Sequence, residues 1–247
     1  MKHHTHIQFE TEDTIKKFQE KLLVENIEYL AARSPFYQKM FTENNIDFRK
    51  IQRLEDLRLL PTTDKVDLQK YNQDFICVER SEIIDYVTTS GTLGEPVMFA
   101  LTNNDLDRLA YNEYLSFSTA GCSADDVMQL MTTLDRRFMA GLAYYMGARL
   151  LGAGIIRVGN GIPQLQWDSI RSVKPTFCMV VPSFLLKLID YAEQNGIDYN
   201  ASSLKKAICI GENLRNPDFT LNTLGQRIHE KWHVPMLLST YASTEMQ

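Results

Sequence analysis

The spacing of hydrophobic positions changes along the chain, and its first part has a helical period. Between residues 12 and 33, apolar residues recur about every 3.6 positions with charged residues between them, which predicts an amphipathic helix. Proline disfavours a helical conformation of the residue before it, so Pro35 is expected to end this helix. Thr63 or Asp64 is a suitable N-cap for a further helix. Residues 1–80 are therefore predicted to be mainly helical.

The downstream part contains short apolar runs separated by segments that are long enough for a helix. Helices are predicted over residues 141–151, from Pro182 to a stop signal at Asn195, and over residues 217–232. This alternation is typical of a mostly parallel sheet that helices cover on both faces. We therefore predict an α/β fold with strands at residues 127–131, 155–158, 177–181, 207–210 and 236–238.

A polar segment between two strand-like runs is the most informative part of the sequence. Residues 88–96 carry four hydroxyl side chains and two glycines, and lie between the apolar runs 83–87 and 97–101. Such a stretch is typical of a hairpin loop, but its backbone N–H groups could also converge on a polyphosphate. The segment contains no Walker A lysine, no dinucleotide-binding G-x-G-x-x-G pattern and no hydrolase G-x-S-x-G elbow. By itself the loop leaves both interpretations open.

Composition argues against several classes of function. The chain has 247 residues, of which 44% are hydrophobic and 23% charged, as in an ordinary globular protein. Its net charge of −5, without a basic stripe, argues against nucleic acid as the main partner. We expect no membrane partner, because no apolar run is long enough to span a bilayer and no signal peptide is recognisable. The four widely spaced cysteines are expected to be reduced thiols of a cytoplasmic protein.

Two predicted strands end in residues with binding chemistry, and parallel sheets bind ligands beyond the carboxyl ends of their strands. One strand is followed by Gly211 and Glu212, and the last one by a segment that holds Tyr241 and Glu245. Each segment alone is typical of an ordinary strand–helix loop. Taken with residues 88–96, they fit a nucleotide site, with phosphates on the first loop, the base on Tyr241 and Mg²⁺ on Glu245.

The order of these motifs resembles that of the AMP-forming adenylating superfamily, which contains acyl-CoA synthetases, adenylation domains and luciferases. Residues 89–96 (TSGTLGEP) resemble its phosphate loop, and residues 241–245 (YASTE) resemble its Y-G-x-T-E motif. Gly211 and Glu212 stand where the family has its adenine-pocket motif. Residues 137–142 stand where relatives have a segment beside the acyl pocket.

Further segments make the chain most similar to one branch of this superfamily, that of phenylacetate–CoA ligase and coenzyme F390 synthetase. The matches that carry this similarity lie at residues 34–37, 54–57 and 60–65. The chain also departs from the family pattern: Leu93 replaces a usual threonine, and Val97 stands where many members have lysine. The other departures are Ile210, Asn213 and Ala242.

The resemblance implies a role for each matching residue. Glu245 would hold Mg²⁺, and Thr92 and Glu245 would act in catalysis. The implied ATP- and AMP-binding residues are Thr89, Ser90, Gly91, Thr92, Gly94, Gly211, Glu212, Tyr241, Ala242, Ser243 and Thr244. The implied acyl-pocket residues are Phe138, Met139, Ala140, Gly141 and Tyr144.

The activity that the resemblance implies is that of an AMP-forming acyl-CoA ligase. A small carboxylic acid, of aryl or arylacetic type, would be activated by ATP as acyl-AMP and then transferred to coenzyme A. Such an enzyme uses ATP, Mg²⁺ and coenzyme A. A homodimer is compatible with the resemblance. Two alternatives stay open: an adenylylating enzyme of the coenzyme F390 synthetase type, and a nucleotide- or acyl-CoA-binding protein without turnover.

The position of the last motif bears on domain organisation. The chain ends two residues after Glu245, whereas relatives continue with an aspartate, a hinge and a small C-terminal domain that bears a catalytic lysine. We therefore expect an N-terminal domain, truncated at its C-terminus and incomplete for catalysis by itself. Its predicted parts are a mainly helical segment, residues 1–80, and a nucleotide- and acyl-binding α/β part, residues 81–247.

Overall fold

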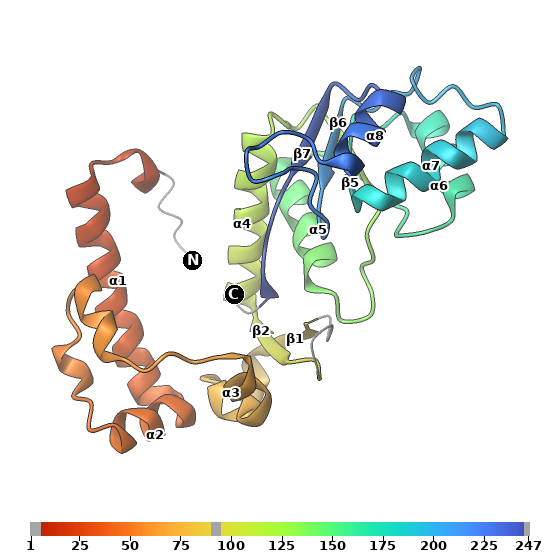
Figure 1. The fold of residues 1–247 in the computed structure, drawn as a ribbon. Coiled ribbons are helices and arrows are strands. Elements are labelled where there is room, and N and C mark those ends of the chain that lie inside the picture. The colour runs from red at the N-terminus through yellow and green to blue at the C-terminus, as the bar shows by residue number, and fades with distance from the viewer. Residues whose placement is uncertain (1–5, 90–94, 245–247) are drawn as a thin grey trace. The chain divides into compact units, whose positions relative to one another are not determined.

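The protein divides into two compact units, Met1–Asn104 and Asp105–Gln247. The structure, a computed structural model, describes residues 6–89 and 95–244 (Figure 1). Each unit is described by itself below. The predicted division after residue 80, into a helical part and a nucleotide- and acyl-binding part, stays a prediction.

The first unit is mainly helical, as predicted. Its α-helices are α1 (Glu12–Arg33), α2 (Pro35–Glu43) and α3 (Lys65–Lys70). Short 3₁₀ turns connect or precede them: η1 (Ile7–Phe9), η2 (Phe48–Lys50), η3 (Leu54–Leu59), η4 (Asn72–Phe75) and η5 (Arg80–Glu82). The predicted cap is confirmed at Asp64, whose carboxylate accepts hydrogen bonds from the backbone N–H groups of Val66 and Asp67.

One buried serine joins the first two helices. Ser34 follows the last residue of α1, and its hydroxyl accepts a hydrogen bond from the Tyr37 N–H in the first turn of α2. Pro35 occupies the first position of α2, where its fixed φ suits a helix and its missing N–H costs nothing. Pro35 therefore ends one helix by starting the next. The same Ser34 hydroxyl donates to the carbonyl of Asp74, 3.0 Å away, which ties η4 to this corner.

The core of the first unit is small. Its buried members are Ile27, Met40, Phe41 and Ile51. Ile27 is the one fully buried residue among the described positions of α1, and most other positions of this long helix are exposed or half-buried. A hairpin of β1 (Ile83–Thr88) and β2 (Met98–Thr102) completes the unit, and its antiparallel pairing confirms the predicted strand–loop–strand pattern.

The second unit is built on a five-stranded sheet in the order β4-β3-β5-β6-β7. All four neighbouring pairs are parallel. The predicted parallel α/β architecture is therefore confirmed, within one or two residues at each strand end. The strands are β3 (Val127–Leu130), β4 (Gly154–Arg157), β5 (Phe177–Val180), β6 (Lys206–Cys209) and β7 (Met236–Ser239).

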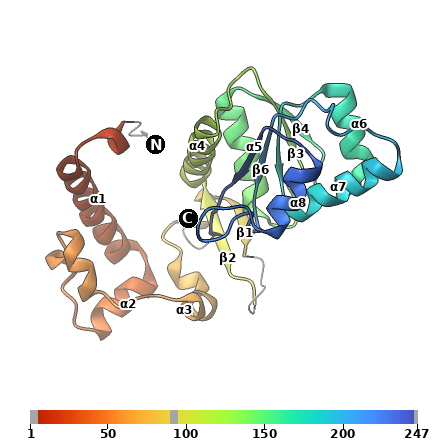
Figure 2. The same cartoon turned by 45° about the horizontal axis from the view of Figure 1, so that its top comes forward.

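Helices cover both faces of this sheet, α4 and α5 on one and α6, α7 and α8 on the other (Figures 1 and 2). The side chains of β5 alternate between the two cores: Phe177 and Met179 join the α4/α5 core, and Cys178 and Val180 join the opposite one. The helices are α4 (Asn103–Thr119), α5 (Met139–Leu151), α6 (Pro163–Val173), α7 (Pro182–Gln194) and α8 (Thr223–Lys231).

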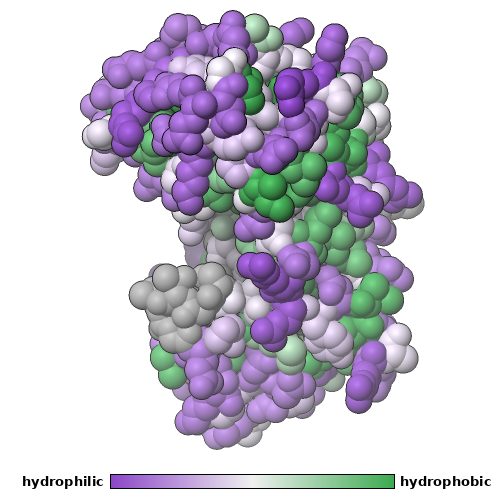
Figure 3. All heavy atoms as spheres, turned by 90° about the vertical axis from the view of Figure 1, so that its right-hand side faces the viewer, coloured by the Kyte–Doolittle hydropathy of each residue, from purple (hydrophilic) through white to green (hydrophobic). Residues whose placement is uncertain are grey.

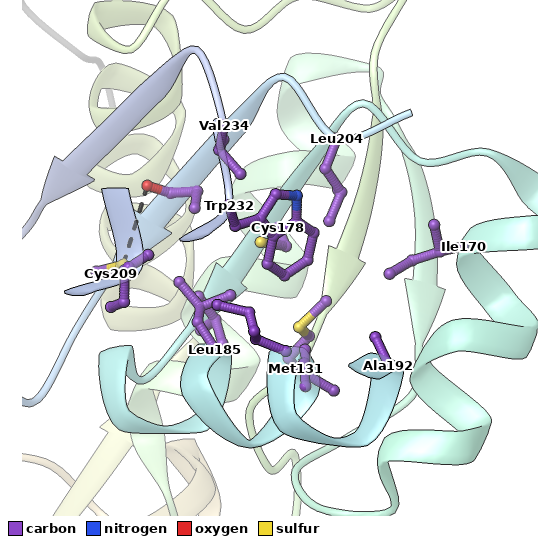
Figure 4. Packing of buried hydrophobic residues seen from close by; sticks show 14 of the residues in the cluster. Met131, Ile170, Cys178, Leu185, Ala192, Leu204, Cys209, Trp232 and Val234 are labelled. Carbon is purple, nitrogen blue, oxygen red and sulfur yellow. Dashed lines mark hydrogen bonds between the residues drawn. The ribbon is translucent and has the colours of Figure 1, made fainter. Parts of the chain in front are cut away.

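The core under α6, α7 and α8 is centred on tryptophan. Trp232 lies among side chains from the sheet and from the covering helices, as Figure 4 shows. Its ring stacks on that of Trp167, with the centroids 5.3 Å apart. Both tryptophans are almost completely buried, so two of the largest apolar side chains of this unit are removed from water.

The predicted helix over residues 217–232 is wrong in its first part. Helix α8 begins at Thr223, and Asn222 caps it by accepting a hydrogen bond from the Gly225 N–H. The preceding residues form a tight turn closed by a bridge between Arg215 and Leu221. Phe219 in this turn has a φ of 65°, a left-handed conformation that no α-helix contains.

In Figure 3 hydrophilic side chains predominate on the face in view, and hydrophobic ones form separate patches. Among the described residues, no helix is both long and apolar enough to cross a bilayer.

Candidate active site

The carboxyl ends of the five strands meet at one edge of the sheet, where parallel sheets bind their ligands. The segment after β6 turns sharply at Gly211, whose φ is 78°. A Cβ added there would meet only Val181 Cγ2, at 4.0 Å, so open space lies beside it. Glycine is needed here for the backbone conformation, since L-residues rarely adopt a positive φ. The backbone at Gly211 is therefore accessible to a ligand.

The neighbouring carboxylate of Glu212 has a partner within the fold. Its oxygens accept hydrogen bonds from the Ser183 N–H and the Ser183 hydroxyl, both at 2.8 Å. Ser183 lies in the first turn of α7, where N–H groups have no helical acceptor and a negative charge is favourable. Glu212 thus fixes the loop after β6 to the start of α7. Its predicted contact with ATP or AMP stays a prediction.

Tyr241 is the most exposed aromatic side chain at this edge, with 88% of its surface accessible. Parallel pairing with β6 continues to Thr240, whose N–H donates to the Cys209 carbonyl at 2.9 Å, so Tyr241 follows directly on the ordered strand. Its ring stacks on no aromatic ring among residues 6–89 and 95–244. A ring held at a strand end and left open on its faces can stack on a planar ligand.

The rest of the last motif lies beside this ring. Ala242 is exposed, and Ser243 and Thr244 are half-buried. Glu245, the predicted Mg²⁺ ligand and catalytic residue, lies outside the described residues. In the part of the chain that is described, no group of three or more histidine, cysteine, aspartate or glutamate side chains could hold a metal ion.

The predicted phosphate loop belongs to the first unit. Hydrogen bonds between Thr89 and Val97 join the two chain segments at its base. The Thr89 N–H donates to the Val97 carbonyl, and the Thr89 hydroxyl accepts from the Val97 N–H, both at 3.0 Å. Thr89 is 7% exposed, so this buried pair closes the base of the loop. Ser90, Gly91, Thr92 and Gly94, the other residues predicted to bind phosphate, lie outside the described residues.

The predicted acyl-pocket residues lie at the start of α5, directly after the loop that leaves β3. Met139 and Tyr144 are buried, Ala140 is half-buried and Phe138 is 37% exposed. Gly141 packs against the β3 loop so closely that an added Cβ would lie 1.8 Å from the Thr133 carbonyl oxygen. The small size of Gly141 is therefore explained by packing of α5, and its role in an acyl pocket stays a prediction.

Tyr144 points into the α4/α5 core. Its ring lies 6.4 Å from that of Phe117, centroid to centroid, and only 3% of the residue is exposed. Burial and the nearby carboxyl group of Glu113 raise the pKa of the Tyr144 hydroxyl well above its ordinary value. The Tyr144 hydroxyl is therefore uncharged, and the side chain is part of the α4/α5 core. Its contact with an acyl group stays a prediction.

Glu113 is the polar residue that the sequence analysis missed. It lies on α4 in the inward-facing series that also contains the buried residues Leu106, Ala110 and Phe117. One carboxyl oxygen, Oε2, is buried without a hydrogen-bond partner, and burial raises the pKa of Glu113 to about 7. A Cβ added to Gly147 of α5 would lie 2.3 Å from Glu113 Cβ, so the two helices are in close contact at this residue.

The geometry is thus that of a parallel sheet with a glycine turn and an open aromatic ring at its carboxyl edge. A family profile described as "AMP-binding enzyme" matches residues 18–247. The chain belongs to this AMP-binding enzyme family. The family resemblance inferred from residues 89–96 and 241–245 is therefore confirmed, while the roles of the individual residues stay predictions.

Curated relatives of this AMP-binding family member are phenylacetate–coenzyme A ligases. The one from Escherichia coli (strain K12) is 30% identical over 198 residues, which are 79% of this chain and 45% of that protein. The one from Thermus thermophilus is 29% identical over 202 residues, 81% of this chain and 45% of that protein. The chain therefore spans about half the length of these relatives, and the similarity confirms the predicted phenylacetate–CoA ligase branch.

Solved structures agree on the fold. A 2-hydroxyisobutyryl-CoA ligase in complex with 2-HIB-AMP and CoA aligns with a TM-score of 0.85 at 22% identity, covering 98% of this chain and 52% of that one. An open conformation of the same ligase gives a TM-score of 0.84 at 21% identity and covers 98% of this chain and 56% of that chain. The AMP-binding family member thus has the fold of part of an acyl-CoA ligase.

Proposed function

We propose that this protein takes part in an AMP-forming acid–thiol ligase reaction, in which a small carboxylic acid is activated by ATP and transferred to coenzyme A. The observation that carries the proposal is the open ring of Tyr241 at the carboxyl end of β7, one strand from the glycine turn at Gly211. The proposal is supported by the curated relatives, which are named phenylacetate–coenzyme A ligases. It is further supported by a structural neighbour described in complex with an acyl adenylate and CoA.

The first step would need little acid–base help from the protein. A carboxylic acid with a pKa of about 4 is already ionised at pH 7, so its oxygen can attack the α-phosphorus of ATP while pyrophosphate leaves. The difficulty is to bring one anion up to another. Hydroxyl and amide donors of residues 89–94 would hold the phosphates, and Tyr241 would stack on adenine.

Mg²⁺ would neutralise phosphate charge when bound, and a carboxylate such as that of Glu245 is the ligand type that it prefers. In the second half of the reaction the thiol sulfur of coenzyme A would attack the acyl carbonyl and AMP would leave. The residues around the start of α5 would contact the acyl group. For the acid we propose an aryl or arylacetic type, following the curated relatives.

The test is pyrophosphate exchange into ATP, measured on the full-length protein against a panel of phenylacetate, benzoate, 2-hydroxyisobutyrate and hexanoate. Exchange that depends on phenylacetate or benzoate and falls in the Tyr241→Ala variant would support the proposal. Nucleotide binding without exchange would favour a binding protein instead. Exchange with hexanoate but not with the aryl acids would contradict the proposed substrate class and leave the reaction type standing.

A further inference from the structure

The start of helix α7 has no cap within its own chain segment. Its N-cap residue is Val181, which makes no side-chain cap hydrogen bond, and Pro182 follows without an N–H group. The first N–H group of the helix is therefore that of Ser183, and it needs an acceptor from elsewhere. Glu212, in the loop after β6, supplies this acceptor with its carboxylate oxygen Oε2, at 2.8 Å. The cap of α7 thus comes from a residue of the candidate active site.

A second hydrogen bond fixes the orientation of this carboxylate. The Ser183 hydroxyl donates to Oε1 of Glu212, also at 2.8 Å, so each carboxylate oxygen has its own donor. Hydrogen bonds to an ionised group are about twice as strong as neutral ones, and a two-point contact adds geometric specificity. Glu212 is exposed and Ser183 is half-buried, so the pair lies at the surface, outside the core. Its main effect is therefore on the loop that carries Glu212.

The turn at Gly211 depends on the residues on either side of it. Within residues 6–89 and 95–244, no protein group forms a hydrogen bond with the N–H or the C=O of Gly211. The residue before it is anchored, because the Ile210 N–H donates to the Val180 carbonyl at 3.0 Å. The residue after it is held by Ser183. Both anchors lie in residues 180–183, so this short segment between β5 and α7 sets the conformation of the turn.

The same turn lies beside the open ring of Tyr241. Cys209 is paired with Ser239, and the Thr240 N–H donates to the Cys209 carbonyl at 2.9 Å, so the two chain segments leave the sheet together. The free backbone groups of Gly211 and the exposed ring of Tyr241 suit a planar heterocycle, whose face stacks and whose edge forms hydrogen bonds. Movement of the turn would misalign the backbone groups with a base that is stacked on the ring.

We infer that Ser183 is a positioning residue of the carboxyl edge, which acts through the Glu212 carboxylate and holds the Gly211 turn in its ligand-binding conformation. The inference rests on the proposed function for the identity of the ligand, which is ATP. It gives Glu212 a different role from the predicted one: its side chain orients the backbone that meets the nucleotide. Ser183 itself needs no contact with the ligand.

The test is ATP affinity, measured by calorimetry on the full-length protein and its variants. Ser183→Ala should bind ATP about tenfold more weakly, because the turn loses one hydrogen bond to a charged group. Ser183→Thr keeps the hydroxyl and should restore the affinity to within about twofold of the wild type. The control is Ser172→Ala, which removes a hydroxyl that bonds only to carbonyls of its own helix, and its affinity should be unchanged. Equal weakening in Ser183→Thr and Ser183→Ala would overturn the inference.

A double-mutant cycle separates positioning from direct contact. If Glu212 and Ser183 act as one unit, Ser183→Ala combined with Glu212→Gln should bind ATP no more weakly than the weaker of the two single variants. Additive losses would show that Glu212 contacts the nucleotide independently of Ser183, and would overturn the inference.

Hydrogen exchange of the ligand-free protein separates this inference from the proposed function. In Ser183→Ala the Ile210 N–H should exchange about tenfold faster, because the adjoining turn has lost an anchor. If the wild type binds ATP, unchanged affinity or unchanged exchange in Ser183→Ala would overturn the inference and leave the proposed function standing. A wild type that binds no ATP would refute the proposed function. The exchange rate of Ile210 would then decide whether Ser183 holds the turn.

Discussion

The two edges of the parallel sheet differ in how their polar side chains are satisfied. At the amino edge, the Asp126 carboxylate accepts hydrogen bonds from the Thr176 hydroxyl at 2.7 Å and from the Ser123 N–H at 2.9 Å, and lies 3.6 Å from the Lys206 ammonium. At the carboxyl edge, Tyr241 is 88% exposed and the space beside Gly211 is open. The Asp126 carboxylate at the amino edge is thus satisfied within the fold, whereas Tyr241 and the backbone at Gly211 leave surface for a ligand at the carboxyl edge.

The pKa of Asp126 follows from this network. Burial acts to raise it, but the hydrogen bonds from Thr176 and Ser123 and the charge of Lys206 outweigh burial and leave the pKa below its ordinary value. Lys206 also donates to the Gly121 carbonyl, which ties the turn after α4 to β6. Substitutions in the Asp126 network should therefore change stability, and the substitution of Tyr241 should change binding.

The largest expected effect tests a place at the carboxyl edge that is tightly packed. In Gly141→Ala the new Cβ would collide with the Thr133 carbonyl oxygen, a backbone atom that cannot rotate away. We expect a loss of about 3 kcal/mol in the free energy of unfolding, measured by urea denaturation. Gly154→Ala is the control, because the atoms nearest to its Cβ belong to the Val127 side chain, the first at 3.2 Å. Equal stability of the two variants would refute this packing argument.

The next effect concerns Glu113, the buried carboxyl group without a partner for Oε2. Its pKa of about 7 lies above the ordinary value of 4.5, so the folded state holds its proton more tightly than the unfolded chain. Its contribution to stability is therefore full below pH 4.5 and is lost as the pH rises through 7. Glu113→Gln should be more stable than the wild type at pH 8, by on the order of 3 kcal/mol, and similar to it near pH 4.5.

The measurement is the free energy of unfolding of the wild type and Glu113→Gln, from urea denaturation at pH 8 and near pH 4.5. Glu230→Gln is the control. Glu230 lies on α8 and is exposed, so its substitution should leave the pH dependence of stability unchanged. A Glu113→Gln variant with the same pH dependence as the wild type would show that this carboxyl group is ionised in the folded protein.

A smaller loss is expected at the amino edge. Asp126→Ala removes the ion-pair partner of Lys206, whose side chain is 16% exposed, and the nearer of the two acceptors of the Thr176 hydroxyl. We expect a loss of about 2 kcal/mol, between the values for exposed and fully buried ion pairs. Nucleotide affinity should not change. A double-mutant cycle with Lys206→Met would isolate the ion pair, and a coupling energy near zero would contradict the assigned role.

The smallest effect on stability should come from Tyr241→Ala, since the ring is so exposed. The free energy of unfolding should stay within about 0.5 kcal/mol of the wild type. Adenine stacking on an aromatic ring contributes about 1–3 kcal/mol, so ATP affinity measured by calorimetry should fall tenfold or more. Phe219→Ala, which removes another exposed ring from a surface turn, is the control. Unchanged ATP affinity in Tyr241→Ala would remove Tyr241 from the site.

Much of the fold could be predicted because hydrophobic periods and helix caps are local signals. The apolar runs predict every strand of the parallel sheet, and Asp64 is one of the two cap residues that the sequence offers before α3. Helix α4 was not predicted. Its inward face is interrupted by a glutamate at residue 113, where the pattern of Leu106, Ala110 and Phe117 leads one to expect an apolar residue.

The start of α8 was misjudged for a different reason. Proline is favoured in the first turn of a helix, so Pro217 was taken as its beginning. The chain instead makes a turn in which Asn216 and Thr220 are hydrogen-bonded, and Asn222 is the cap. The decisive contact is the bridge between Arg215 and Leu221, which a residue-by-residue pattern does not contain.

The candidate site could be predicted only as a set of motifs. Sequence order placed Gly211 and Tyr241 after neighbouring strands, and the topology brings those strand ends to one edge. The hydrogen bonds between Glu212 and Ser183 could not be predicted, because the two residues are 29 positions apart in sequence. They come together because β5 and β6, which precede them, are paired in the sheet. The packing of Gly141 on Thr133 is likewise a tertiary contact.

The stacked pair of Trp167 and Trp232 has a consequence for spectroscopy. These are the only tryptophans in the sequence, and both lie under the same helices of the second unit. Indole emission, and any exciton signal from two rings 5.3 Å apart, will therefore report on that one layer. The first unit contains no tryptophan. A melting curve followed by indole fluorescence would not detect its unfolding, so tyrosine absorbance or limited proteolysis is required to follow it.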